Sequence, residues 1–285
     1  MTFRGHDITL GGHVSTAGGV WNAPLRAEKF GFTTFQIFSK NQMQWSAKPL
    51  PEDDVRLFRE NVAVKGMSKI LVHASYLLNL AADDSMQRER TLNAFREEIE
   101  RSDKLGTEYL VIHPGSAGKI GERKAMRNIS DALNSCMTAD RKTTVLLETA
   151  AGQGTNVGYT FEQLSDMIDG VELKAKVGIC FDTCHVFASG YDIKSNEGYA
   201  ETMDRFISSV GLTRLMAIHL NDSKKGQGSR LDRHEQIGKG MLGLQGIANF
   251  VNDRRLSQVP MCLETPLGED GYDKDIEAIV SVLKG

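Results

Sequence analysis

Eight short runs of apolar or β-branched residues recur along the chain, and longer polar segments separate them. Each run is nearly continuous in hydrophobicity, as expected of parallel strands that are buried on both faces. The runs therefore predict eight strands, at residues 8–14, 33–38, 69–72, 109–112, 143–147, 177–181, 215–218 and 259–263.

The segments between these runs show the spacing of amphipathic helices. In residues 84–105, Phe95 and Ile99 fall near one apolar stripe, and Arg and Glu occupy other faces. Gly106 follows directly and predicts the end of that helix. Other helices are expected to begin at Pro51 and Thr160 and to span residues 270–283.

Strict alternation of strand and helix predicts an α/β fold with a parallel sheet. An open, doubly wound sheet is one way to build it, but a count of eight strands favours a closed (β/α)8 TIM barrel. A length of 285 residues fits one such barrel, and no linker rich in Pro, Gly or Ser divides the chain. We therefore expect a single domain over residues 1–285.

Composition narrows the function only slightly. The formal net charge is −3, so a nucleic-acid partner would have to be recognised by a local basic patch. The first ten residues lack the apolar core of a signal peptide, and no apolar run is long enough to cross a bilayer. We expect no membrane association, and a reducing, cytoplasmic compartment with four buried free thiols, Cys136, Cys180, Cys184 and Cys262.

Six of the eight predicted strands end in a side chain that can bind a metal ion. Because all C-terminal strand ends of a barrel meet at one mouth, groups far apart in the sequence should converge there. A polar, glycine-containing loop after the seventh run adds two more groups, and a histidine three residues after Asp182 adds another. The nine are His73, His113, Glu148, Asp182, His185, His219, Asp232, His234 and Glu264.

Each of these groups has an ordinary explanation when it is taken alone. A histidine at a strand end is often simply hydrogen bonded, and an Asp or Glu there often caps a helix. The loop that carries Asp232 and His234 fits a solvated surface loop. Together, however, several carboxylates at close quarters without cations would carry a high cost in desolvation and repulsion. Nine ligands exceed the needs of one tetrahedral zinc and suit two or three ions, an arrangement typical of phosphate-ester cleavage.

Three segments, 113–116, 178–185 and 218–234, resemble signature segments of the endonuclease IV family, the trinuclear-zinc apurinic/apyrimidinic endonucleases of base-excision repair. The resemblance runs from residues 13–15 to residues 264–265 in the same order. Xylose-isomerase-like sugar isomerases and epimerases share parts of the pattern, so a sugar-phosphate isomerase or epimerase is the alternative. A non-enzymatic DNA-binding barrel would give no reason for the nine ligands.

The resemblance implies three Zn²⁺ ions per chain, with Mn²⁺ possible, in three groups: His73, His113 and Glu148; Glu148, Asp182, His219 and Glu264; and His185, Asp232 and His234. It also implies hydrolysis of the phosphodiester 5′ to an abasic site, which leaves a 3′-hydroxyl and a 5′-deoxyribose phosphate. Repair of 3′ ends is expected as a further activity. Glu148, Asp182 and Glu264 are the expected catalytic residues. The implied partner is double-stranded DNA that contains abasic sites, and the family favours a monomer.

Two loops match family segments that contact DNA. Tyr76 and Leu77 match a loop that wedges into the duplex, although packing at a helix start explains them equally well. In the segment after the second run, the expected contacts are Lys40, Asn41, Gln42 and Met43. Positive charge near the third metal group is expected from Lys224, Arg230 and Arg233, whose alternative role is a solvated surface.

Two positions depart from the family pattern. Thr149 stands where the family usually has Asn, which puts the support of Glu148 in doubt. Met43 stands where the well-known bacterial members carry Arg.

Overall fold

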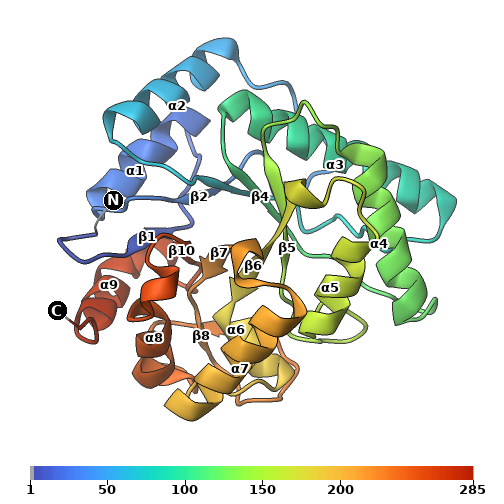
Figure 1. The fold of residues 1–285 in the computed structure, drawn as a ribbon. Helices are drawn as coiled ribbons and strands as arrows, with labels where there is room; N and C mark the ends of the chain where they lie inside the picture. The colour runs from blue at the N-terminus through green and yellow to red at the C-terminus, as the bar shows by residue number, and fades with distance from the viewer. Residues whose placement is uncertain (1–2, 285) are drawn as a thin grey trace.

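Eight parallel strands form the inner wall of the structure, a computed structural model that describes residues 3–284 (Figure 1). They are β1 (Thr9–Gly12), β2 (Gln36–Phe38), β3 (Leu71–His73), β4 (Tyr109–Ile112), β5 (Thr144–Glu148), β6 (Val177–Asp182), β7 (Leu215–His219) and β10 (Pro260–Leu263). Their hydrogen-bonded order is β1-β10-β7-β6-β5-β4-β3-β2. Every predicted strand run contains one of these strands or most of it.

The seam between β1 and β2 closes the barrel. His13 forms a parallel bridge with Gln36, and the Val14 N–H donates to the Gln36 carbonyl over 2.8 Å. Gly11 is required at this seam because a Cβ there would clash with the Thr34 carbonyl oxygen. The predicted closed barrel is confirmed, and the open doubly wound sheet is excluded.

Helices ring the strands on the outside (Figure 1). The α-helices are α1 (Ala23–Lys29), α2 (Glu52–Val64), α3 (Ser85–Leu105), α4 (Glu122–Cys136), α5 (Phe161–Asp169), α6 (Thr183–Ser189), α7 (Asn196–Ser209), α8 (Gly243–Val251) and α9 (Tyr272–Val280). Short 3₁₀ helices are η1 (Val20–Asn22), η2 (Lys174–Lys176), η3 (Leu212–Arg214), η4 (Arg254–Leu256) and η5 (Gly268–Asp270). None of the helices within residues 3–284 combines the length and apolarity needed to cross a membrane.

Local sequence explains where these helices begin and end. The Asp84 side chain accepts a hydrogen bond from the Gln87 N–H at the start of α3, and Gly106 ends the helix in the left-handed region at φ 75°. The predicted final helix is shorter than expected, because residues 268–270 form η5 and α9 begins only at Tyr272.

The core has two parts. One layer fills the barrel interior and consists of Leu71, Val111, Leu146, Cys180, Ala217 and Cys262. A larger cluster packs between the strands and the surrounding helices. All four cysteines are buried free thiols, as predicted.

A small antiparallel hairpin, β8 (Asp222–Ser223) with β9 (His234–Glu235), follows β7 and was not predicted. The buried Asp222 carboxylate stabilises it by accepting hydrogen bonds of 3.0–3.1 Å from four backbone N–H groups, those of Gly238, Gly240, Leu242 and Gly243. The loop that carries Asp232 and His234 is therefore attached firmly to the barrel mouth.

Candidate metal centre at the barrel mouth

The C-terminal ends of the strands supply most of the candidate ligands. His73, Glu148, Asp182 and His219 are the last residues of β3, β5, β6 and β7, and His113 and Glu264 directly follow β4 and β10. Asp182 and His219 are also register partners in neighbouring strands. Parallel pairing thus brings together side chains that lie far apart in the sequence.

Glu148 lies at the centre of this arrangement and its side chain is fully buried. Its Oε2 atom is 3.3 Å from His73 Nε2 and 3.2 Å from His113 Nε2. Its Oε1 atom is 2.9 Å from His219 Nδ1 and 3.4 Å from His185 Nδ1. The two carboxylate oxygens therefore face different imidazoles, as they would in a carboxylate that bridges two cations.

The side chains form three groups. Within each group, the potential ligand atoms lie within 4.8 Å of one another. The first group is His73, His113 and Glu148; the second is Glu148, Asp182, His219 and Glu264; the third is His185, Asp232 and His234. The structure thus brings together each set that the family resemblance implied, and Glu148 belongs to two of them.

Cys184 forms a further grouping with Asp182 and His234. Burial raises the pKa of its thiol to about 12. The thiol also donates to the Arg233 carbonyl over 3.5 Å. A protonated thiol is a poor metal ligand, so we do not include Cys184 in the candidate centre.

Two carboxylates at the mouth, Glu148 and Asp232, are held ionised. Burial opposes the charge of Glu148, yet His113 and His219 hold its pKa well below the usual range. Burial likewise opposes the charge of Asp232, but His185 and His234 lower its pKa to about 2. A buried cluster of this charge requires cations, either protons on the imidazoles or metal ions.

The imidazole hydrogen bonds favour metal ions. Three rings donate Nδ1–H to a backbone carbonyl: His73 to Ala74 (2.7 Å), His185 to Thr149 (2.8 Å) and His234 to Glu264 (3.0 Å). The Nε2 atoms of His185 and His234 are buried and have no hydrogen-bond partner of acceptable geometry among residues 3–284. Fixed Nδ1–H donors leave the Nε2 atoms to face an ion, which is the usual arrangement of metal-binding histidines, so these residues fit divalent ions.

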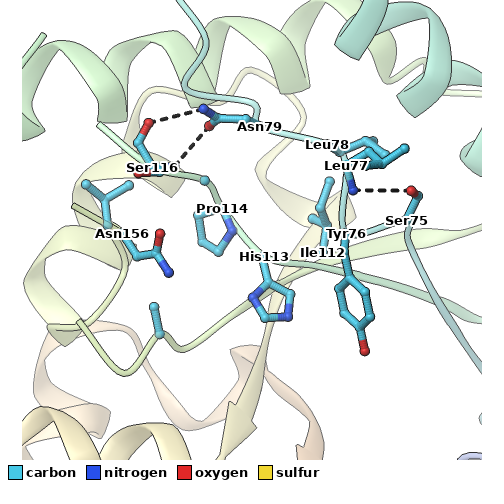
Figure 2. Close-up of a pocket in the computed structure, with 13 residues that line it drawn as sticks. Ser75, Tyr76, Leu77, Leu78, Asn79, Ile112, His113, Pro114, Ser116 and Asn156 are labelled. Atoms are coloured by element: carbon cyan, nitrogen blue, oxygen red, sulfur yellow. Dashed lines mark hydrogen bonds between the residues drawn. The ribbon is translucent and has the colours of Figure 1, made fainter. Parts of the chain in front are cut away.

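Tyr76 lies at the edge of the first group. Its ring centroid is 5.4 Å from that of His73 and 5.9 Å from that of His113, and Figure 2 shows the Tyr76 and His113 rings side by side. The side chain is 55% exposed, whereas Leu77 is half-buried. A cavity of about 290 Å³ opens between the 75–79 loop and residues 112–116, next to His113.

In the loop after β2, Met43 is 63% exposed, Asn41 is exposed and Gln42 is half-buried. The prediction that Lys40 contacts DNA is wrong. Its side chain is only 1% exposed, and its Nζ atom lies 3.2 Å from Glu97 Oε1 and 3.4 Å from Glu98 Oε1. Lys40 therefore neutralises carboxylates of α3 and holds its own loop in place.

The predicted basic residues near the third group are Lys224, Arg230 and Arg233. All three are exposed, and the Arg233 guanidinium donates a hydrogen bond to Gln153 Oε1 over 3.4 Å. Arg230 has a positive φ of 53°, and its guanidinium lies 5.1 Å from the centroid of the Tyr159 ring. The contact of these residues with DNA stays a prediction.

Comparison with known proteins identifies the family. A family model described as a xylose isomerase-like TIM barrel matches residues 24–282. The "Probable endonuclease 4" of Campylobacter concisus (strain 13826) is 43% identical over 278 residues, which cover 96% of this chain and 98% of the relative. The chain belongs to the endonuclease IV family.

Solved structures agree with this membership in the endonuclease IV family. The crystal structure of endonuclease IV from Thermus thermophilus matches with a TM-score of 0.85 at 32% identity and covers 96% of this chain and 98% of its own. A D-tagatose 3-epimerase-like protein matches with a TM-score of 0.74 at 18% identity. The match covers 96% of this chain and 97% of that protein. That lower identity shows a shared barrel fold alone.

Thr149, one departure from the endonuclease IV pattern, supports other ligands than Glu148. Its hydroxyl accepts the Asp182 N–H over 2.9 Å, and its carbonyl accepts the His185 Nδ1–H. Thr149 thus orients one residue of the second group and one of the third. A hydroxyl with a backbone carbonyl is sufficient for this role, so the substitution leaves the ligand set supported.

Sequence reasoning missed two buried polar residues that contact the candidate ligands, Gln36 and Asn221. The Asn221 Nδ2 atom donates to Asp182 Oδ2 over 2.8 Å, and its Oδ1 atom accepts the Glu264 N–H over 2.8 Å. The available signal was a carboxamide inside an otherwise apolar strand or two residues after one, because a buried amide must find partners.

Proposed function

We propose that this chain is a metal-dependent endonuclease that hydrolyses the phosphodiester 5′ to apurinic/apyrimidinic sites in duplex DNA. The products are a 3′-hydroxyl and a 5′-deoxyribose phosphate. One observation carries the proposal: three groups of candidate ligands converge at one barrel mouth, and two of them share the buried Glu148. Membership in the endonuclease IV family supports it independently.

The proposed metal centre holds three Zn²⁺ ions, with Mn²⁺ as a possible replacement. His73, His113 and Glu148 hold the first, Glu148 with Asp182, His219 and Glu264 the second, and His185, Asp232 and His234 the third. Bound divalent ions lower the pKa of water and neutralise the charge that develops on a phosphate. Glu148, Asp182 and Glu264 are the proposed catalytic residues, because their carboxylates set the ion positions from the centre of the mouth.

DNA would approach through the loops around the mouth. Tyr76 presents an exposed aromatic face beside the first group, and Leu77 follows it. An aromatic and an aliphatic side chain replace stacking that is lost where a base is missing. Asn41, Gln42 and Met43 extend this surface. The side chains of Lys224, Arg230 and Arg233 supply the positive charge that phosphate contacts require.

We infer that residues 1–285 act as one domain, as a monomer, in the cytoplasm. Removal of damaged groups from 3′ ends is a second proposed activity, because a phosphate ester at a strand end presents the same oxygens to the same centre.

The deciding experiment measures incision of a duplex with one abasic site, beside an undamaged duplex and a panel of ketose-epimerisation substrates. Elemental analysis of the same preparation should find three ions per chain. Glu148→Gln should lose nearly all incision while circular dichroism stays unchanged, because an amide bridges two cations poorly. Sugar epimerisation without incision, or normal turnover by Glu148→Gln, would refute the proposal.

A further inference from the structure

We propose that Gln36 is a positioning residue that fixes two ligands of the second group, His219 and Glu264, through opposite ends of one carboxamide. The inference rests on the proposed metal centre. Gln36 begins β2 and is fully buried, although it lies at the seam where β1 and β2 close the barrel. Its side chain reaches across the mouth to residues of β7 and the end of β10.

The contacts of this amide are short and specific. Gln36 Oε1 lies 2.8 Å from His219 Nε2, and Gln36 Nε2 lies 2.5 Å from Glu264 Oε1. Gln36 Nε2 also lies 3.1 Å from His13 Nδ1. The carbonyl end and both hydrogens of the amino end therefore have partners, as a buried carboxamide requires.

These contacts fix the proton positions on His219. A carbonyl oxygen can only accept, so His219 must carry its proton on Nε2 and donate it to Gln36. Its Nδ1 atom lies 2.9 Å from Glu148 Oε1 and 3.2 Å from Glu264 Oε2, and this is the atom that would bind an ion of the second group. In this tautomer the imidazole faces the second group with its ligand atom.

The amino end of the Gln36 carboxamide orients the carboxylate of Glu264. One hydrogen of Gln36 Nε2 occupies Glu264 Oε1, which leaves Oε2 directed toward His219 and the second group. The other hydrogen meets His13 Nδ1, which must accept and therefore carries its own proton on Nε2. The carboxylate of Glu264 prevents the amide from reversing, since a reversed carbonyl would face it.

Few other side chains can satisfy this site. It needs an acceptor for an imidazole N–H and a donor for a carboxylate, on one planar group in a closed space. A glutamate would place a second carboxylate against Glu264, and a lysine could not accept from His219. An apolar residue would leave both ligands without their outer partners.

The test uses the zinc-loaded protein and two substitutions. Gln36→Met keeps an unbranched side chain of similar length but removes all three hydrogen bonds. Gln36→Glu keeps the acceptor for His219 and removes the donor for Glu264, and it serves if the methionine variant does not fold. Zinc retained per chain is measured against a series of chelator concentrations, and anomalous scattering at the zinc edge identifies which ion is lost.

Each variant should lose the ion of the second group first, with an affinity lowered about 10- to 100-fold, while the third group keeps its ion. Gln163→Leu is the matched control, because the buried Gln163 also makes three hydrogen bonds but lies outside the ligand groups. That control should lose stability and keep the affinities of all three ions.

Unchanged zinc affinity in a folded Gln36 variant would overturn the inference alone. Equal loss of all ions, matched by Gln163→Leu, would also overturn it, because Gln36 would then be merely structural. A wild-type chain that holds no ion in the second group would overturn both this inference and the proposed metal centre.

Discussion

Replacing Lys40 with methionine should destabilise the fold strongly and leave the salt dependence of DNA binding unchanged. The side chain of Lys40 is 1% exposed, and its Nζ atom contacts Glu97, Glu98 and the Trp45 carbonyl at 3.1–3.4 Å. Lys40→Met preserves the length of the side chain but removes its charge. The buried carboxylate of Glu98 then loses its cation.

The magnitude follows from burial. Removing one partner of a buried ion pair costs about 3–5 kcal/mol, because the remaining charge stays desolvated. The Glu98 side chain is also 1% exposed, so water cannot replace the ammonium without opening the loop. With a urea m-value of about 3 kcal/mol/M, the unfolding midpoint should fall by about 1 to 1.7 M.

Urea unfolding followed by circular dichroism measures this shift. Lys104→Met is the matched control, because Lys104 pairs with Glu52 at the surface and is 47% exposed. Exposed pairs contribute little, so its midpoint should hardly move. The double variant Lys40→Met/Glu98→Gln should recover part of the loss, because it removes both buried charges and keeps the acceptor oxygen of residue 98.

DNA titrations at several salt concentrations complete the test. Lys224→Met should reduce the slope of log affinity against log salt by about one unit if Lys224 contacts a phosphate. Folded Lys40→Met should keep the wild-type slope. A stable Lys40→Met protein with a slope reduced by one unit would refute the structural role and restore Lys40 to the DNA interface.

Two further predictions concern the mouth. His234→Ala should remove one ion per chain, as measured by elemental analysis. It should also slow incision by about 100-fold or more, because one group of phosphate-stabilising ligands is lost. A variant that keeps the full incision rate and three ions would exclude the third group. Met43→Arg should steepen the slope of log DNA affinity against log salt concentration by about one unit and tighten DNA binding at low salt. Met43→Ala should weaken DNA binding with little change in that slope. Identical titrations of the wild type and both variants would show that Met43 does not touch DNA.

The strands could be predicted from the sequence because each is a short apolar run bounded by polar residues. The convergence of the candidate ligands could be predicted for a related reason. Residues such as Glu148 and Asp182 end apolar runs, and barrel topology brings every strand end to one mouth. The pattern thus predicts that these side chains converge, whereas their division into three groups was implied by the resemblance to endonuclease IV.

Lys40 and Gln36 show where this reasoning fails. A lysine in a polar loop suggests a phosphate contact, and nothing local indicates that Glu97 and Glu98 of α3, more than fifty residues away, will cover it. A glutamine at the start of an apolar strand resembles an ordinary edge residue. Its partners come from distant strands, so its role depends on how the barrel closes.

The same buried carboxylate that pairs with Lys40 also connects the two candidate DNA loops. Glu98 Oε2 accepts the Ser39 hydroxyl over 2.9 Å, and Glu98 Oε1 accepts the Ser75 N–H over 3.1 Å. The Ser75 hydroxyl in turn donates to the Gln42 carbonyl over 2.7 Å. The loops that present Met43 and Tyr76 are therefore fixed to α3 and to each other. Because these loops are ordered before DNA binds, the free energy of binding is not reduced by the cost of ordering them. More of that free energy is available to unstack a lesion.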